Sequence, residues 1–187
     1  MKRALLKICL IFIVFFAIVG VIQSATVSQP SVKISDGYIS VSAILSPPPE
    51  FIEEINQGMT KEIVFYIDLF RIWKLWPDEF VKGKKIVRTI KVNKIKREFL
   101  VSSHEENIIR EKRFSDIESM MNWAFAINDI RLEGVSTLDH GRYYIKVSAD
   151  AVKRDIPPLV GFLLFFISDK EFSLSSSSET FVISDNR

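Results

Sequence analysis

The chain has 187 residues and a formal net charge of +2 at pH 7, a length that suits one domain behind a leader segment. Three positive charges, on Lys2, Arg3 and Lys7, stand at the start, so the rest is nearly neutral, with 22 Lys and Arg against 23 Asp and Glu. This balance argues against a strongly basic nucleic-acid-binding protein, and the ordinary apolar content argues against disorder.

The N-terminus has the residue order of a secretory signal. After the basic start, fifteen apolar residues run from Ile8 to Ile22, and Gln23-Ser24-Ala25 follows. A helix of this run spans roughly 22 Å, whereas the hydrocarbon core of a bilayer is about 30 Å thick. Signal peptidase prefers a small residue three positions back from the cut, but cleavage after Ala25 would place Gln23 there and cleavage after Ser24 would place Ile22 there. We therefore expect residues 1–25 to be either a cleaved signal peptide or an uncleaved N-terminal membrane anchor, and residues 26–187 to form a single β-rich domain.

Cys9, the only cysteine, lies inside this apolar run. A single cysteine excludes an intramolecular disulfide, a cysteine metal site and a redox pair. The residues before it, Leu6, Lys7 and Ile8, are not the small residues that lipoprotein processing prefers. The exported body is therefore expected to be free of thiols.

The first predicted elements after the leader are a hairpin and a helix. Val32 to Ser35 and Tyr38 to Leu45 are β-type runs separated by Asp36-Gly37, a two-residue hairpin signal. The second run alternates apolar residues with serines, which is typical of a half-buried strand. Phe51 to Ile55 has helical spacing, and Gly58 is a natural helix end.

A long antiparallel hairpin is predicted next. Lys61 to Lys74 is a strand rich in Ile, Val, Phe and Tyr, and Pro77-Asp78 makes its turn. Glu79 to Val101 returns as strand with a break near Gly83 and a further bend at Lys94-Ile95-Lys96, and Ile108 to Arg113 is a further strand. The connections are too short for crossover helices, so the pairing is expected to be antiparallel.

The last third of the body combines one helix with two strands. Ser115 to Asn128 is predicted as a helix, with Ser115 as N-cap three residues before Glu118. Tyr143 to Ala149 alternates as a strand does, and Glu171 to Ile183 reads as a final strand. Seven or eight strands with two or three short helices predict a mainly β, antiparallel, sandwich-like fold, with an α+β fold as the alternative.

A second apolar run, nine residues from Leu159 to Ile167, follows Asp155 and two prolines. As a helix it covers roughly 15 Å, half of a bilayer core, which argues against a second span. Prolines suit a helix start, so we expect a short helix that caps one end of the sandwich. An apolar surface that dips into the membrane and a buried strand are the alternatives. Joint exposure of Phe162, Phe165 and Phe166 would favour a membrane or partner surface.

Basic and aromatic residues gather between Arg71 and Arg113, where thirteen Lys and Arg oppose six Asp and Glu. The basic residues form either the solvated face of strands or a surface for an anionic membrane or acidic protein. Trp73 and Trp76 lie beside the predicted turn. They are either membrane-interface or binding hot-spot residues, or they pack in the core at the end of the sandwich. The candidate interaction surface comprises Arg71, Trp73, Trp76, Lys84, Lys85, Phe162, Phe165 and Phe166.

No catalytic, cofactor or metal site is predicted. His104-Glu105-Glu106 and Asp139-His140 each lack a third member at a diagnostic spacing, and both histidines are expected in solvated turns. No serine lies in a nucleophile elbow, and no glycine-rich loop is present to bind phosphates. We therefore expect no enzymatic activity and no cofactor.

Several stretches of the body match the pattern of one family, namely Phe70 to Val81, Ile90 to Val101, the F-S-D-I-E helix start, Gly141-Arg142-Tyr143-Tyr144, Ile156-Pro157-Pro158-Leu159 and Phe172-Ser173-Leu174-Ser175. Through them the body from Val32 to Ile183 resembles an exported bacterial family catalogued as domain of unknown function 4390. The family favours Trp where this chain has Phe172. The resemblance implies an envelope protein, often encoded beside a membrane sensor histidine kinase, and it offers no catalytic residues.

Taken together, these features predict an exported, non-catalytic protein of the bacterial periplasm or of the periplasmic face of the inner membrane. The expected role is protein interaction, with a membrane sensor kinase as one candidate partner. Binding of a lipid or another apolar ligand at the membrane surface is the alternative. No nucleic-acid partner is expected.

Overall fold

The computed structural model of the chain describes residues 24–152 and 170–184. The predictions for residues 1–23 and for the run Leu159–Ile167, including Phe162, Phe165 and Phe166, lie outside the described residues. Within the described ranges, no helix is long and apolar enough to cross a membrane.

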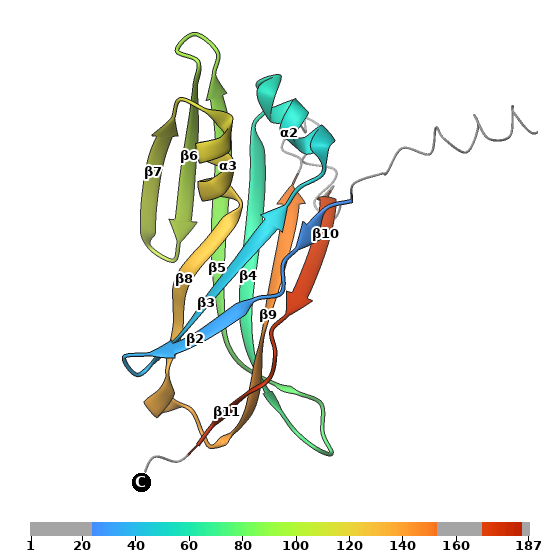
Figure 1. Cartoon of the computed structure of the whole chain (residues 1–187), viewed down its shortest axis with the longest axis vertical. Helices are drawn as coiled ribbons and strands as arrows, with labels where there is room; N and C mark the ends of the chain where they lie inside the picture. Colours follow the sequence, from blue (N-terminus) through green and yellow to red (C-terminus); the bar gives the residue numbers. More distant parts are fainter. Residues whose placement is uncertain (1–23, 153–169, 185–187) are drawn as a thin grey trace, which may run out of the picture.

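Two antiparallel sheets make up the described part of the chain (Figure 1). The larger sheet has the order β10-β9-β4-β5-β6-β7, and the short β11 also pairs with β9. Its strands are β4 (Lys61–Ile72), β5 (Glu79–Asn93), β6 (Glu98–Glu105), β7 (Ile108–Phe114), β9 (Gly141–Val152), β10 (Lys170–Ser177) and β11 (Phe181–Ile183).

The smaller sheet is centred on β3, which pairs with β1 and β2 along one edge and with β8 along the other. Figure 1 shows it lying across the larger sheet. Its strands are β1 (Thr26–Val27), β2 (Ser31–Ser35), β3 (Tyr38–Ser46) and β8 (Ala126–Gly134), and the helices are α2 (Pro49–Asn56), α3 (Ile117–Ala124) and the 3-10 turn η1 (Val135–Thr137). The prediction of a mainly β, sandwich-like antiparallel fold with few helices is confirmed.

The core lies between the two sheets and follows the period of two that strands impose. Alternate residues of the central strands point inward and are buried, namely Ile39, Val41, Ala43 and Leu45 on β3, Ile63, Phe65, Ile67 and Leu69 on β4, and Tyr143, Ile145, Val147, Ala149 and Ala151 on β9. Burial of each large apolar side chain contributes at most about 1.5–3 kcal/mol. The alternation seen in the sequence therefore sets which face of each strand is inside.

The hairpin of β2 and β3 has the predicted turn. Asp36 and Gly37 have φ angles of 54° and 75°, and Ser35 pairs with Tyr38 across them. Two consecutive positive φ angles define the turn type whose twist suits a two-residue hairpin. Gly58, at φ 91°, follows the end of α2 as predicted.

The predicted helix from Ser115 to Asn128 is too long and has the wrong cap. Asp116 is the N-cap, and its carboxylate accepts a hydrogen bond of 2.7 Å from the Ser119 amide. The helix ends at Ala124, because residues from Ala126 onward pair with β3 as strand β8. The sequence analysis missed β8, which pairs with β3 through two register shifts.

Two predicted strand features also differ in the structure. β5 continues unbroken through Gly83, and the irregularity lies earlier, where the pairing with β4 shifts between Leu69 and Phe70. The last strand is divided into β10 and β11, because Ser178 leaves the ladder and its hydroxyl accepts a hydrogen bond from the Ile145 amide. β10 is an edge strand of the larger sheet.

The sandwich has two distinct ends, joined by β4. At one end, which we call the leader end, Thr26 pairs with Ser46 and Val152 pairs with both Glu62 and Lys170. At the other end β4 and β5 are joined by residues 73–78 (Figure 1). Twelve residues of β4 separate the two ends, a length of roughly 36 Å for an extended strand.

Candidate interaction surface

Four large apolar side chains lie exposed where β4 turns into β5. Trp73, Leu75, Trp76 and Phe80 are 44%, 92%, 76% and 57% exposed, and we call this group the tip. Of the two interpretations of the tryptophans, core packing is therefore wrong. Single exposed apolar residues are ordinary on protein surfaces, but several together mark an interaction site.

Arg71 fixes the first of these side chains. Its Nη1 donates to the Asp139 carboxylate at 2.9 Å and its Nη2 donates to the His140 carbonyl at 2.8 Å. The same guanidinium lies 4.5 Å from the centroid of the Trp73 ring, a cation–π contact. On the other side, Trp73 Nε1 donates to the Glu79 carboxylate at 3.1 Å. Trp73 is thus held although it is exposed.

The loop that anchors Arg71 is itself tied to the core. The hydroxyl of Tyr143 donates to the Asp139 carbonyl at 2.6 Å, and the Tyr143 ring is buried and stacks on Phe181. Burial raises the pKa of Tyr143, opposed by the charge of Arg71. The chain of contacts therefore runs from a buried ring through Asp139 and Arg71 to Trp73.

Aromatic rings continue from the tip onto the outer face of the large sheet. Phe70 meets Phe80 edge-on with ring centroids 5.9 Å apart, and stacks on Tyr144 at 5.3 Å. The Phe80 ring lies over Gly83, where an added Cβ would stand 3.0 Å from its Cζ. Gly83 therefore makes room for Phe80 instead of breaking the strand.

Lys84 and Lys85 do not belong to this surface. They are consecutive in β5, so they point to opposite faces of the sheet. Lys84 is half-buried between the sheets and donates to the Glu105 carboxylate at 2.8 Å and to the Arg131 carbonyl. Lys85 lies on the outer face, 5.8 Å from the Tyr66 ring centroid. The structure thus places Arg71 and Trp73 in contact and leaves Trp76 exposed in the same turn, whereas the two lysines point to opposite faces of the sheet.

Leu75 and Phe80 are tip residues that the sequence analysis did not single out. Leu75 stands between the two tryptophans in Trp73-Lys74-Leu75-Trp76, a signal that was available. Phe80 lies just after the turn in β5, and nothing in the local pattern distinguishes it from a core residue.

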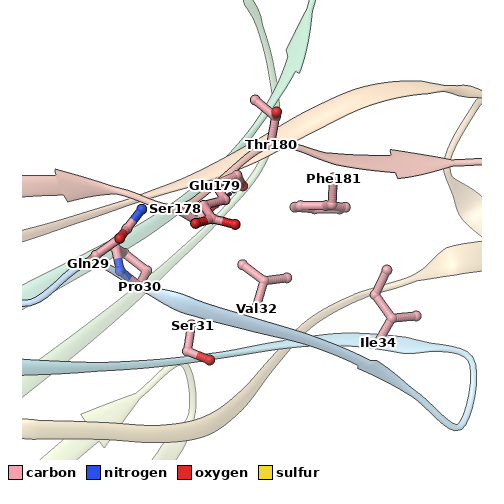
Figure 2. Close-up of a pocket in the computed structure, with 9 residues that line it drawn as sticks. All are labelled: Gln29, Pro30, Ser31, Val32, Ile34, Ser178, Glu179, Thr180 and Phe181. Atoms are coloured by element: carbon pink, nitrogen blue, oxygen red, sulfur yellow. Dashed lines mark hydrogen bonds between the residues drawn. The ribbon is translucent and has the colours of Figure 1, made fainter.

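Two grooves lie elsewhere on the surface. One of about 410 Å³ opens where the edges of the two sheets meet, and Figure 2 shows Val32 and Ile34 of β2 facing Phe181 across it. The other, of about 650 Å³, lies at the leader end between α2 and α3 and is lined mostly by apolar residues, among them Ile44, Ile52, Met121 and Phe125. Both are open surface features, not enclosed cavities of the core.

The two histidines occupy different settings. His104 was expected in a turn but lies in β6, paired with Ile109 and exposed. His140 lies in the loop before β9, where its carbonyl binds Arg71. In residues 24–152 and 170–184, no three His, Cys, Asp or Glu side chains are grouped as metal ligands would be.

Comparison with known proteins places this fold in a family. The family model described as Domain of unknown function (DUF4390) matches residues 22–180. The chain belongs to this family. The DUF4390 match covers β1 to β10, α2, α3 and the whole tip, so the family resemblance of the sequence is confirmed. No curated protein and no solved structure matches this DUF4390 chain.

Proposed function

We propose that this protein is a non-catalytic, exported envelope module that binds another envelope protein through the tip. The observation that carries the proposal is the group of exposed apolar side chains, two of them tryptophans, at the end of one hairpin. Tryptophan is enriched among the residues that dominate binding energy at protein interfaces. Because Trp73 is already held by Arg71 and Glu79, little side-chain freedom is lost on binding.

The charges around the tip favour a protein over an anionic membrane as the partner. Three basic residues, Arg71, Lys74 and Arg142, and three carboxylates, Asp78, Glu79 and Asp139, flank the tip. Anionic headgroups attract clusters of basic residues and are repelled by carboxylates. A partner with an apolar pocket and a mixed polar rim matches this surface better.

The position of the tip also fits a protein partner. The leader is attached through residue 24, and the tip lies at the opposite end of the sandwich, roughly 36 Å away along β4. A chain anchored in the membrane at the leader end would present the tip away from the membrane. The periplasmic part of a membrane sensor kinase is a candidate partner, which rests on the gene context that the family implies.

The test is a pull-down from bacterial membranes with matched variants of the full chain. Leu75→Ser with Trp76→Ser removes the most exposed part of the tip, and Ile95→Ser changes a 96% exposed residue in the turn between β5 and β6. We expect one envelope protein to be recovered by the wild type and by Ile95→Ser, but not by the tip variant. Equal recovery by all three proteins would refute a role for the tip.

Binding of an apolar ligand is the second candidate, favoured by the groove at the leader end. Ile44, 57% exposed, and Ile52 line this groove beside the strand that follows the leader. Its volume of about 650 Å³ falls in the range of ligand pockets. Organic extraction of the purified chain followed by mass spectrometry is the test, and recovery of no apolar compound would count against this candidate.

A further inference from the structure

A buried arginine lies between the sheets, away from the tip. Arg88 is on the inner face of β5, between the buried Ile86 and Ile90, and only 6% of it is exposed. Its guanidinium lies 5.1 Å from the ring centroid of Trp123 and 5.5 Å from that of Phe65. Burial lowers the pKa of Arg88 to about 10, opposed by the charge of Glu105. A cation in such a place needs specific partners.

Part of the Arg88 side chain has a structural role. Nη1 donates to the carbonyls of Trp123, Ala124 and Ala126, at 2.5, 3.0 and 2.6 Å. Trp123 and Ala124 are the last residues of α3, where the helix leaves carbonyls unpaired and favours a positive charge, and Ala126 is the first residue of β8. Arg88 thus supplies a donor to carbonyls at the junction of α3 and β8.

The rest of the guanidinium is not explained by that role. Nε is enclosed and has no acceptor, and Nη2 donates to none of the described residues. No carboxylate of the described residues lies within 4 Å of it. Glu105, the charged neighbour, is already paired with Lys84 at 2.8 Å. Arg88 therefore retains hydrogen-bonding capacity that the described protein does not use.

Arg88 is also one of the residues that line a cavity of about 130 Å³. It is lined by Ile86, Arg88, Ser103, Glu105, Arg110, Trp123, Ala126, Asn128 and Ile130. Ser103 pairs with Arg88 on one side and with Arg110 on the other, so both guanidinium groups stand on the same face of the sheet. Apart from Glu105, the charged and polar side chains that line it can all donate hydrogen bonds.

We infer that this cavity binds a carboxylate group, held by Arg88 and Arg110 with Ser103 and Asn128 as further donors. A planar carboxylate matches the fork of a guanidinium. The single carboxylate of Glu105 at the edge favours a singly charged ligand over a phosphate dianion. The carboxylate belongs either to a small organic acid or to an acidic side chain of a peptide. The inference concerns a site separate from the tip and does not depend on the proposed partner.

The test is NMR of the full chain labelled with ¹⁵N-arginine, titrated with sodium acetate at constant ionic strength maintained with chloride. The Nε–H signal of Arg88 is assigned by its loss in Arg88→Lys. We expect this signal to shift and saturate with acetate. A second titration with N-acetylglutamate amide places the same group on a peptide unit. A response to both probes indicates that a peptide-borne carboxylate fits, and a response to acetate alone indicates a small free acid.

Matched variants on β7 distinguish binding in the cavity from attraction of acetate to positive charge anywhere on the strand. Arg110 and Arg113 are both exposed on this strand, but only Arg110 lines the cavity. We expect Arg110→Ala to weaken the acetate affinity roughly two- to fivefold, as expected for an exposed charge partner, and Arg113→Ala to leave it unchanged. Equal effects of the two variants, no shift of the Arg88 signal with acetate, or a larger shift with inorganic phosphate would overturn the assignment.

Discussion

The guanidinium of Arg71 lies 4.5 Å from the centre of the Trp73 ring. The same group binds Asp139 and the His140 carbonyl in the loop before β9. One side chain of β4 thus connects the exposed tip to the sheet and to the buried ring of Tyr143. Trp73, one of the four side chains of the proposed interaction surface, is therefore held in place.

Removing the apolar residues of the tip is expected to leave stability unchanged. Leu75 and Trp76 are 92% and 76% exposed, so Leu75→Ser with Trp76→Ser should change the free energy of unfolding by no more than about 0.5 kcal/mol. Urea unfolding followed by circular dichroism measures this. A loss of several kcal/mol would mean that these side chains serve the fold, and the tip would no longer qualify as a binding surface.

Removing Arg71 is expected to loosen the tip. Arg71→Ala loses one ion pair, one hydrogen bond to a carbonyl and the contact with Trp73, a cost of about 1–2 kcal/mol. Amide hydrogen exchange should become faster in residues 72–79. Arg71→Lys should restore only part of the protection, because an ammonium group cannot form the same fork. Lys74→Ala is the control on the same hairpin. Unchanged exchange in Arg71→Ala would contradict the proposed anchoring.

Lys61 is expected to hold α2 and β10 onto β4. Its side chain is only 3% exposed, and its ammonium group donates to Glu54 of α2 and to Glu171 of β10, the latter at 2.6 Å. Burial lowers its pKa, but the hydrogen bonds and charges of Glu171 and Glu54 outweigh this, so the pKa is raised. Lys61→Ala should cost about 2–3 kcal/mol, because it leaves these carboxylates without their cation. Chemical denaturation provides the measurement.

A second variant distinguishes the charge of Lys61 from its packing. Lys61→Met combined with Glu171→Gln keeps the apolar stem and removes one of the carboxylates. We expect it to recover part of the stability that Lys61→Ala loses. If Lys61→Ala is within about 0.5 kcal/mol of the wild type, the buried ion pairs do not join these elements.

Tyr143 is expected to give stability a dependence on alkaline pH. Its pKa is raised in the folded state by burial, so the stability from its hydroxyl is fully present below the ordinary tyrosine pKa of about 10 and is lost as pH rises further. Tyr143→Phe should cost about 1 kcal/mol near pH 7. The difference between wild type and variant should shrink above about pH 10. A difference that stays constant would show that the hydroxyl does not titrate as proposed.

Local sequence patterns were sufficient to predict the elements whose structure depends on residues nearby in the chain. Asp36-Gly37 predicted its hairpin because two positive φ angles suit few other residues. The alternation on β3 and β9 predicted their buried faces, since one face of each strand packs on the other sheet. The extent of α3 was missed because contacts with distant residues decide it: the chain from Ala126 onward pairs with β3. Arg88, far along the chain, binds the carbonyls at the end of α3.

β8 was missed for a related reason. Its pairing with β3 shifts register twice, near Ser40 and near Ala43, so its buried residues Ile127 and Leu132 do not follow a strict period of two. A bulge changes which face a residue occupies, and the sequence pattern alone does not reveal it.

The candidate site was predicted in part. The sequence placed Trp73 and Trp76 beside a turn. The alternation of buried and exposed residues stops where the strand ends, so the sequence did not predict whether these two side chains are buried or exposed. Lys84 and Lys85 were grouped by composition, and the strand geometry places them on opposite faces. Arg88 lies between Ile86 and Ile90 at strand spacing, which predicts that it points inward. Counting the basic residues together did not reveal this.

Photo-crosslinking from the tip in intact cells tests the central claim most directly. Trp76 is replaced by benzoylphenylalanine in the full chain, and Ile95, equally exposed in another turn, receives the same replacement as a control. We predict that position 76 crosslinks to one envelope protein and that position 95 does not. Crosslinks to lipid alone, no protein adduct from position 76, or the same adducts from both positions would contradict the account.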